Sequence, residues 1–175
     1  MSLVILTRLS LCLVLPWLAS AAAAQARLDI DVKARIMIGL VRFIQWPEAM
    51  AGEPVLRLCV WQRAAGVVDA FRPHELRPVN GRRLAVVDRA PGAFDGCRAL
   101  FVHASASAPG TALSDAARAG VLTVGDPDGF AAMGGMVELV SVNDAIRFDV
   151  NLAAFKAGGL AMSSQALRLA RSIRE

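Results

Sequence analysis

Short apolar runs separated by turn residues organise the last third of the chain. Residues 121–124 are apolar and rich in β-branched side chains, which is typical of a buried strand. Two further strand-like runs, 136–142 and 145–150, flank Asn143 and Asp144, residue types that tolerate the positive φ of a tight hairpin. The pattern therefore predicts a buried strand followed by a β-hairpin.

Polar residues that favour helix ends punctuate the same region. Asp126 or Asp128 is placed to cap a short helical turn over 130–133. Asn151 stands at the N-cap position of a helix over 152–157, which the glycine pair 158–159 ends. These positions predict where helical segments begin and end.

The C-terminal segment is predicted to form a short strand and then a last helix. The strand is expected at 160–162, and Ser163 or Ser164 is expected to cap the helix. In that helix Leu167 and Leu169 alternate with basic residues, among them Arg168 and Arg171.

The start of the chain after residue 28 reads as an amphipathic helix over 29–45. Its apolar residues recur at helical spacing, Asp29 or Asp31 can cap it, and the Trp46-Pro47 pair is expected to end it. Strand-like runs at 55–61, 83–87 and 97–102 then alternate with helical patterns at 67–71 and 111–119. This rhythm predicts one compact α/β domain, with a mixed, mostly parallel sheet flanked by helices and a C-terminal β-hairpin.

Residues 1–24 have the features of an export signal. Arg8 precedes an apolar run that ends in small residues, and cleavage after Ala24 or Ala26 fits the small-x-small rule. An uncleaved membrane anchor is the alternative, although 9–24 is short for a span and contains Pro16. The prediction is a signal peptide at 1–24 and an exported domain at 27–175.

Composition and charge narrow the function classes. The net charge is +4, and the basic residues are spread along the chain rather than concentrated in one stripe, so nucleic-acid binding is not indicated. The expected exported domain retains two cysteines, Cys59 and Cys97, each in a strand-like run. In an oxidising compartment they can form a disulfide, and two buried free thiols are the alternative. No spacing typical of a metal site is present.

Residues able to perform chemistry are few. His103 ends a predicted strand, and Asp126 and Asp128 follow another, which is where ligand crevices of α/β proteins open. Each also has an ordinary structural explanation, as a core-edge histidine or as helix caps. No nucleophile elbow, phosphate loop or acid–base pair is recognisable. The sequence thus favours a binding protein without a cofactor over an enzyme. Three function classes remain to be separated: an interaction protein, a small-molecule-binding module and an unrecognised hydrolase.

Several segments together resemble the YfiR family of periplasmic proteins. They are VKARIMIGLVRFIQWP, LRLCV, CRALFV, VLTVGDPDGF, GGMVEL, RFDVNL and AGGLAMSSQALRLA, and they span essentially the whole expected exported domain. The resemblance implies a disulfide between Cys59 and Cys97. One departure is the loop after 55–61, which lacks the family's usual acidic residue.

This resemblance also implies a function. Family members are periplasmic repressors of a membrane-bound diguanylate cyclase, act on its periplasmic sensor region, lower cyclic di-GMP and are typically dimeric. The implied partner of this chain is a membrane diguanylate cyclase or a related sensor protein. Candidate partner-binding residues are Phe43 and Trp46 at the end of the first helix, and Leu167, Arg168 and Arg171 in the last helix. Each face can equally be packed inside or form the homodimer contact.

Overall fold

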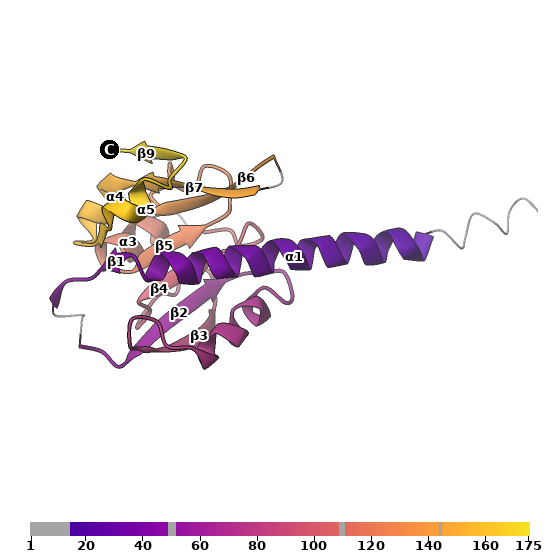
Figure 1. The fold of residues 1–175 in the computed structure, drawn as a ribbon, viewed down its shortest axis with the longest axis horizontal. Helices are drawn as coiled ribbons and strands as arrows, with labels where there is room; N and C mark the ends of the chain where they lie inside the picture. The colour runs from indigo at the N-terminus through magenta and orange to yellow at the C-terminus, as the bar shows by residue number, and fades with distance from the viewer. Residues whose placement is uncertain (1–14, 49–51, 109–110, 144) are drawn as a thin grey trace, which may run out of the picture.

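The computed structural model describes residues 15–48, 52–108, 111–143 and 145–175, with side chains from residue 25 onward. Its centre is one seven-stranded sheet in the order β3-β2-β4-β5-β6-β7-β9 (Figure 1). The strands are β2 (Val55–Trp61), β3 (Arg83–Arg89), β4 (Ala99–Val102), β5 (Leu122–Gly125), β6 (Val137–Val142), β7 (Ala145–Asn151) and β9 (Ser172–Arg174). All neighbours pair in parallel except β6 and β7. The predicted mixed, mostly parallel sheet with a late hairpin is confirmed.

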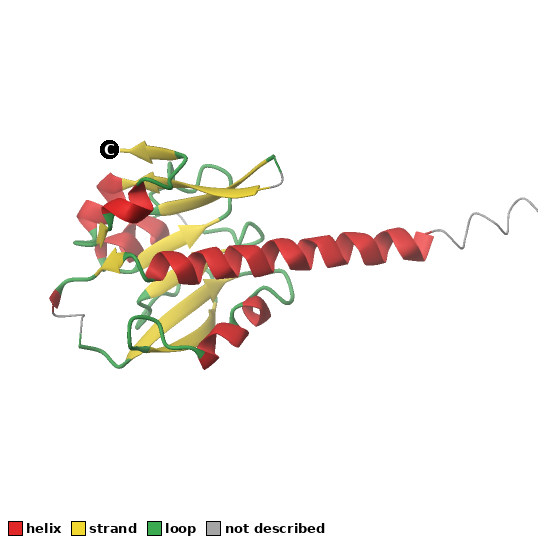
Figure 2. Cartoon of the chain, in the orientation of Figure 1, coloured by secondary structure: helices red, strands yellow, loops and turns green. Residues whose placement is uncertain are grey.

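Helices cover both faces of this sheet (Figure 2), as the alternation of side chains along its central strands requires. Leu58 and Val60 of β2 belong to a core cluster that also contains the buried face of the helix α1 (Leu15–Val41). Cys59 and Trp61 of the same strand point into a second cluster with buried residues of α3 (Ala112–Arg118). Because successive strand residues face opposite sides, one sheet has two separate cores.

The first helix differs from its prediction at both ends. The helix α1 begins well before residue 29, so Asp29 and Asp31 lie inside it and cannot cap it. It ends at Val41, because Ile44–Gln45 forms strand β1 and pairs antiparallel with Ala161–Met162, the strand β8. A tertiary strand pair therefore ends the helix before Trp46-Pro47 is reached. No helix within the described ranges is long and apolar enough to cross a bilayer.

The middle of the chain follows its predicted pattern with shorter helices. After β2, the chain forms two 3-10 helices, η1 (Val68–Ala70) and η2 (Arg72–Leu76), where the sequence predicted a single helical segment at 67–71. Helix α3 then connects β4 to β5.

The predicted caps of the C-terminal region are partly right. Asn151 caps α4 (Leu152–Ala157) by accepting a hydrogen bond from Ala154 N, and its amide also donates to Ala131 O at 2.9 Å. Ser163 caps α5 (Ser164–Leu167) by accepting from Ala166 N. Asn143 adopts φ 47° at the hairpin turn, as expected.

Two expectations in this region are wrong. Residues 130–133 form consecutive turns, and Glu138, rather than Asp126 or Asp128, accepts hydrogen bonds there, from Gly129 N and Ala131 N. The last helix ends at Leu167, because Ser172–Arg174 leaves it to pair with β7 as an edge strand. Leu167, Arg168 and Arg171 therefore do not share one helical face.

Candidate functional site

Three parallel strands end side by side at one edge of the sheet. His103 directly follows β4, and its N–H donates to Trp61 O at the end of β2 at 3.0 Å. Asp126 directly follows β5, and its N–H donates to Val102 O at 3.1 Å. The carboxyl ends of parallel strands are where ligand sites of α/β sheets form. The structure thus brings His103 and Asp126 to the expected edge.

A hydrogen-bond network fixes the His103 ring. Ser105 Oγ accepts from Arg63 N and Ala64 N at 3.0 Å each, so its own hydrogen is directed to His103 Nδ1 at 2.8 Å. Ser105 N also donates to Nδ1, at 3.1 Å. Because Nδ1 only accepts, the neutral imidazole carries its hydrogen on Nε2, which is the ring atom left for a ligand.

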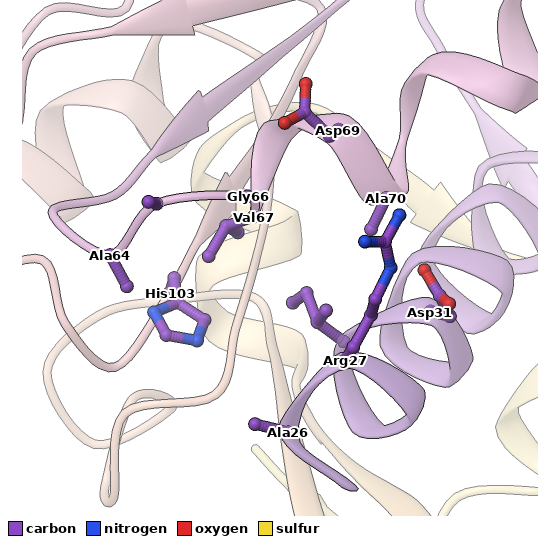
Figure 3. A pocket seen from close by; sticks show the side chains of 11 residues that line it. Ala26, Arg27, Asp31, Ala64, Gly66, Val67, Asp69, Ala70 and His103 are labelled. Carbon is purple, nitrogen blue, oxygen red and sulfur yellow. The ribbon is translucent and has the colours of Figure 1, made fainter. Parts of the chain in front are cut away.

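His103 lines a cavity of about 420 Å³ between the middle of α1 and the loop that follows β2 (Figure 3). The remaining lining residues are Ala26, Arg27, Ile30, Asp31, Ala64, Ala65, Gly66, Val67, Asp69 and Ala70. Apolar side chains dominate the walls, and the charged ones are Arg27, Asp31 and Asp69. We name this space the His103 cavity. Mixed apolar and charged walls suit a small molecule with at least one polar group.

Asp126 does not line this cavity, because its carboxylate is engaged in a buried ion pair. Its Oδ2 lies 2.7 Å from Lys33 Nζ, and the two side chains are only 3% and 12% exposed. Its Oδ1 accepts from Ala104 N at 2.6 Å. Lys33 also pairs with Asp29, at 2.5 Å, within α1. Asp126 therefore links α1 to the loops at the carboxyl ends of the parallel strands.

The pKa of Lys33 reflects this arrangement. Burial lowers it, but the hydrogen bonds from Lys33 to Asp126 and Asp29 outweigh burial and hold the pKa above its usual value. The ammonium therefore stays charged, and the pair acts as a structural tie.

The remaining residue of the predicted crevice, Asp128, is exposed and lies outside the His103 cavity. The sequence reading missed Arg27, Asp31 and Asp69, which α1 and η1 bring to the cavity. The sequence contains a local indication only for the wall of the His103 cavity that the loop after β2 forms. Residues 64–66 of that loop are small and follow a predicted strand, and Gly66 adopts φ 83°.

The structure brings the two predicted partner-binding stretches together. The β1–β8 pair joins the end of the first helix to the start of α5, and Ser163 N donates to Phe43 O at 2.9 Å. The side chain of Phe43 is exposed. Trp46 is half-buried, with the Arg82 guanidinium 5.5 Å from its ring centre.

The other predicted partner residues have different environments. Leu167 packs against the main core and Arg168 is exposed. Arg171 forms an ion pair with Asp149 of β7, which lowers the pKa of that carboxyl through the Arg171 hydrogen bond. Arg171 thus contributes to holding the C-terminal edge strand.

A disulfide between Cys59 and Cys97 is present, as expected. It joins β2 to the residues just before β4, with Cα atoms 5.8 Å apart, and both residues are 1% exposed. In the described part of the chain, no group of three or more His, Cys, Asp or Glu side chains is arranged to hold a metal.

Comparison with known proteins gives a family and a fold. A YfiR/HmsC-like family model matches residues 30–171. No curated protein matches the chain.

Two solved structures are similar to this chain. The ABC domain in complex with L-Trp from Streptococcus pneumonia is 10% identical with a TM-score of 0.53, over 80% of this chain and 61% of that one. A conserved domain protein from Vibrio cholerae is 8% identical with a TM-score of 0.49, over 83% of this chain and 60% of that one. The chain thus spans about three-fifths of each, and the first similarity shows a common fold alone.

Proposed function

Because this chain belongs to the YfiR/HmsC-like family over residues 30–171, we propose that it is an exported periplasmic regulator of a membrane-bound diguanylate cyclase. It binds the periplasmic sensor region of the cyclase, represses the enzyme and so lowers cyclic di-GMP. The family match is the observation that carries this proposal. Repression requires that the protein bind the inactive state of the cyclase more tightly than the active state.

Removal of an export signal is compatible with the folded domain. Both expected cleavage positions, after Ala24 and after Ala26, lie within α1, whose N-terminal part projects from the body of the molecule (Figure 1). Ile30 is the first core residue of the described side chains, and residues 25–28 are exposed. Cleavage at either position would therefore remove none of the described core. Mass spectrometry of the periplasmic protein would identify the new N-terminus, and retention of residues 1–24 would contradict export by a cleaved signal.

The surface around the β1–β8 pair supports binding of a protein partner. We define it as the partner surface, consisting of Phe43, Trp46 and Arg168. It combines an exposed aromatic ring, a half-buried tryptophan beside Arg82 and an exposed cationic side chain. Aromatic and arginine side chains are enriched at the centres of interfaces. The surface is also available for the homodimer that the family resemblance implies.

The test is cellular cyclic di-GMP in a strain that lacks the gene. Deletion should raise cyclic di-GMP, and the exported wild-type protein should restore the lower level. Phe43→Asp with Arg168→Glu should fail to restore it. Leu76→Asp with Arg147→Glu is the matched control, because it changes an exposed apolar and an exposed basic residue elsewhere and should restore repression.

The results separate the parts of the proposal. An unchanged cyclic di-GMP level on deletion would contradict regulation of a cyclase. Equal repression by both double variants, at equal periplasmic abundance, would leave the regulation intact but contradict this partner surface. Sedimentation of the same variants would show whether Phe43 and Arg168 contribute to a dimer instead.

A second candidate function is a periplasmic small-molecule-binding module without a cyclase partner, and the His103 cavity favours it. A ligand there would contact α1, η1 and His103 at once. Thermal-shift screening of small polar metabolites, with His103→Phe as the blocked variant, tests this function. Stabilisation that persists in His103→Phe would contradict binding in this cavity.

A further inference from the structure

A second, smaller concavity lies between the C-terminal half of α1 and the segment around η2. Its volume is about 230 Å³, and Arg35, Ile38, Gly39, Arg42, His74, Arg77 and Val79 line it. Ile38 and Val79 are buried, whereas the three arginines are exposed. An apolar floor thus has a cationic rim built from two segments. We name it the arginine pocket.

The arginines of this pocket form no ion pair with a carboxylate of the described residues. Five other cations form ion pairs with carboxylates in the described part of the chain: Lys33, Arg72, Arg98, Arg118 and Arg171. Within that same part, Arg35, Arg42 and Arg77 form none. The carboxylate adjacent to His74 along the chain, Glu75, is directed to β3, where it accepts from Val86 N at 2.7 Å.

The environment of His74 shows the same excess of positive charge. Burial lowers the pKa of His74 first, and the charges of Arg35, Arg77 and Arg42 lower it further. Asp31, one turn before Arg35 on α1, is the acid that raises it, and the net direction is still down. Three cations and one carboxylate therefore surround a half-buried imidazole.

Contacts between the two segments and a glycine in the lining shape the pocket. Asn80 Nδ2 donates to Arg42 O at 3.3 Å and so ties the turn after Arg77 to the end of α1. Gly39 provides part of the lining, and a Cβ built there meets no atom within 4 Å, so the space above it is empty of side chains. The Asn80 side chain thus connects the two walls of the pocket.

We propose that the arginine pocket binds a phosphoryl group, either of a soluble phosphate ester or of a phospholipid headgroup. A tetrahedral phosphoryl group presents several acceptor oxygens and up to two negative charges, which matches three guanidinium groups and an imidazole better than a single carboxylate does. The volume suits such a small group rather than a large ligand. The site shares no lining residue with the His103 cavity, and it does not depend on the proposed regulation of a cyclase.

The first experiment measures binding of inorganic phosphate and glycerol 3-phosphate to the purified protein by calorimetry at low ionic strength. The pocket variant is Arg35→Gln with Arg77→Gln, and the charge-matched control is Arg147→Gln with Arg174→Gln, on strands β7 and β9 at the other end of the sheet. We expect the Kd to rise by about tenfold or more in the pocket variant and to stay the same in the control.

Gly39→Leu provides an independent test, because it fills the pocket without changing charge. It should weaken phosphate binding while the arginines remain. NMR titration of His74 gives a second readout: phosphate should raise the pKa of His74 by offsetting the arginine charges.

The source of the phosphoryl group is decided by a parallel experiment with vesicles of phosphatidylglycerol and phosphatidylcholine against vesicles of phosphatidylcholine alone. Arginine-dependent binding of soluble phosphates identifies a soluble ester, and arginine-dependent binding of the anionic vesicles alone identifies a headgroup. Equal losses in the pocket and control variants would overturn the proposal, since they would reflect general charge attraction. Absence of binding to all phosphate probes would also overturn it, and binding of an acidic peptide instead would assign the surface to an acidic protein segment.

Discussion

The buried ion pair between Lys33 and Asp126 allows a quantitative test of what holds α1 on the sheet. The perturbation is Asp126→Asn, which keeps the size of the side chain and an oxygen that can accept from Ala104 N. It removes the negative charge 2.7 Å from the Lys33 ammonium. Lys33 is then left buried with Asp29 as its remaining acid.

The expected cost follows from burial. Removing one partner of a buried ion pair costs about 3–5 kcal/mol, because the other charge remains desolvated. Asp29 still contacts Lys33 but is 39% exposed, so we expect a loss near the low end, about 3 kcal/mol. Asp29→Asn alone should cost about 0.5 kcal/mol, as an exposed pair within one helix does.

Urea unfolding at pH 7 measures these differences. With a slope of about 2 kcal/mol per molar urea, Asp126→Asn should lower the midpoint by about 1.5 M. Lys33→Met with Asp126→Asn removes both charges and should recover most of the loss, which gives the coupling between the two residues. The pKa of Lys33 is raised in the folded protein, so the contribution is fully present below the unfolded value of 10.5 and is lost as pH rises through the folded value.

Two outcomes would contradict a stabilising buried pair between Lys33 and Asp126. If Asp126→Asn costs no more than Asp29→Asn, the pair behaves as an exposed one and does not secure α1. If the double variant is as unstable as Asp126→Asn, the loss arises from packing or from the Ala104 hydrogen bond rather than from an uncompensated ammonium.

Three further predictions concern stability. Replacing Cys59 and Cys97 with alanine opens a loop of 38 residues and should lower the free energy of unfolding by about 4 kcal/mol by the loop-entropy relation, measured by urea unfolding. An equal loss of stability on reduction of the wild-type protein would support this expectation, and an unchanged stability would contradict it. Asn151→Ala removes a helix cap and a buried hydrogen bond, so thermal unfolding should show a loss of about 2 kcal/mol, whereas a loss below about 0.5 kcal/mol would show that water replaces both. Arg171→Gln should raise the pKa of Asp149 toward its usual 3.8. A lowered carboxyl pKa stabilises the folded protein above pH 3.8, and this stability is lost as pH falls through the folded pKa, so the variant should lose less stability on acidification than the wild type. Parallel acid-unfolding curves of the two proteins would contradict this contribution of Arg171.

Local patterns in the sequence determined the elements whose causes lie within a few residues. The strand at Val55–Trp61 has the predicted bounds, and the hairpin turns at Asn143, which adopts φ 47°. Asn151 and Ser163 cap helices because each accepts from a backbone N–H three residues later. The resemblance of the chain to the YfiR family, likewise visible in the sequence, implied the disulfide that the structure contains.

Contacts between distant residues decided the rest. The first helix ends at Val41 because strand β1 pairs with β8 near the C-terminus, and the last helix ends at Leu167 because Ser172–Arg174 pairs with β7. Asp126 reads locally as a cap, yet it pairs with Lys33, 93 residues away.

The two pockets follow the same rule. The sequence places His103 at the end of a strand, but only the packing of α1 against the loop after β2 closes a cavity beside it. Arg35 and Arg42 lie seven residues apart on one helix, and the fold adds Arg77 from a separate segment. Hydrophobic periodicity and capping report on a residue and its immediate neighbours, whereas charge pairing and cavities depend on which distant segments the core brings together.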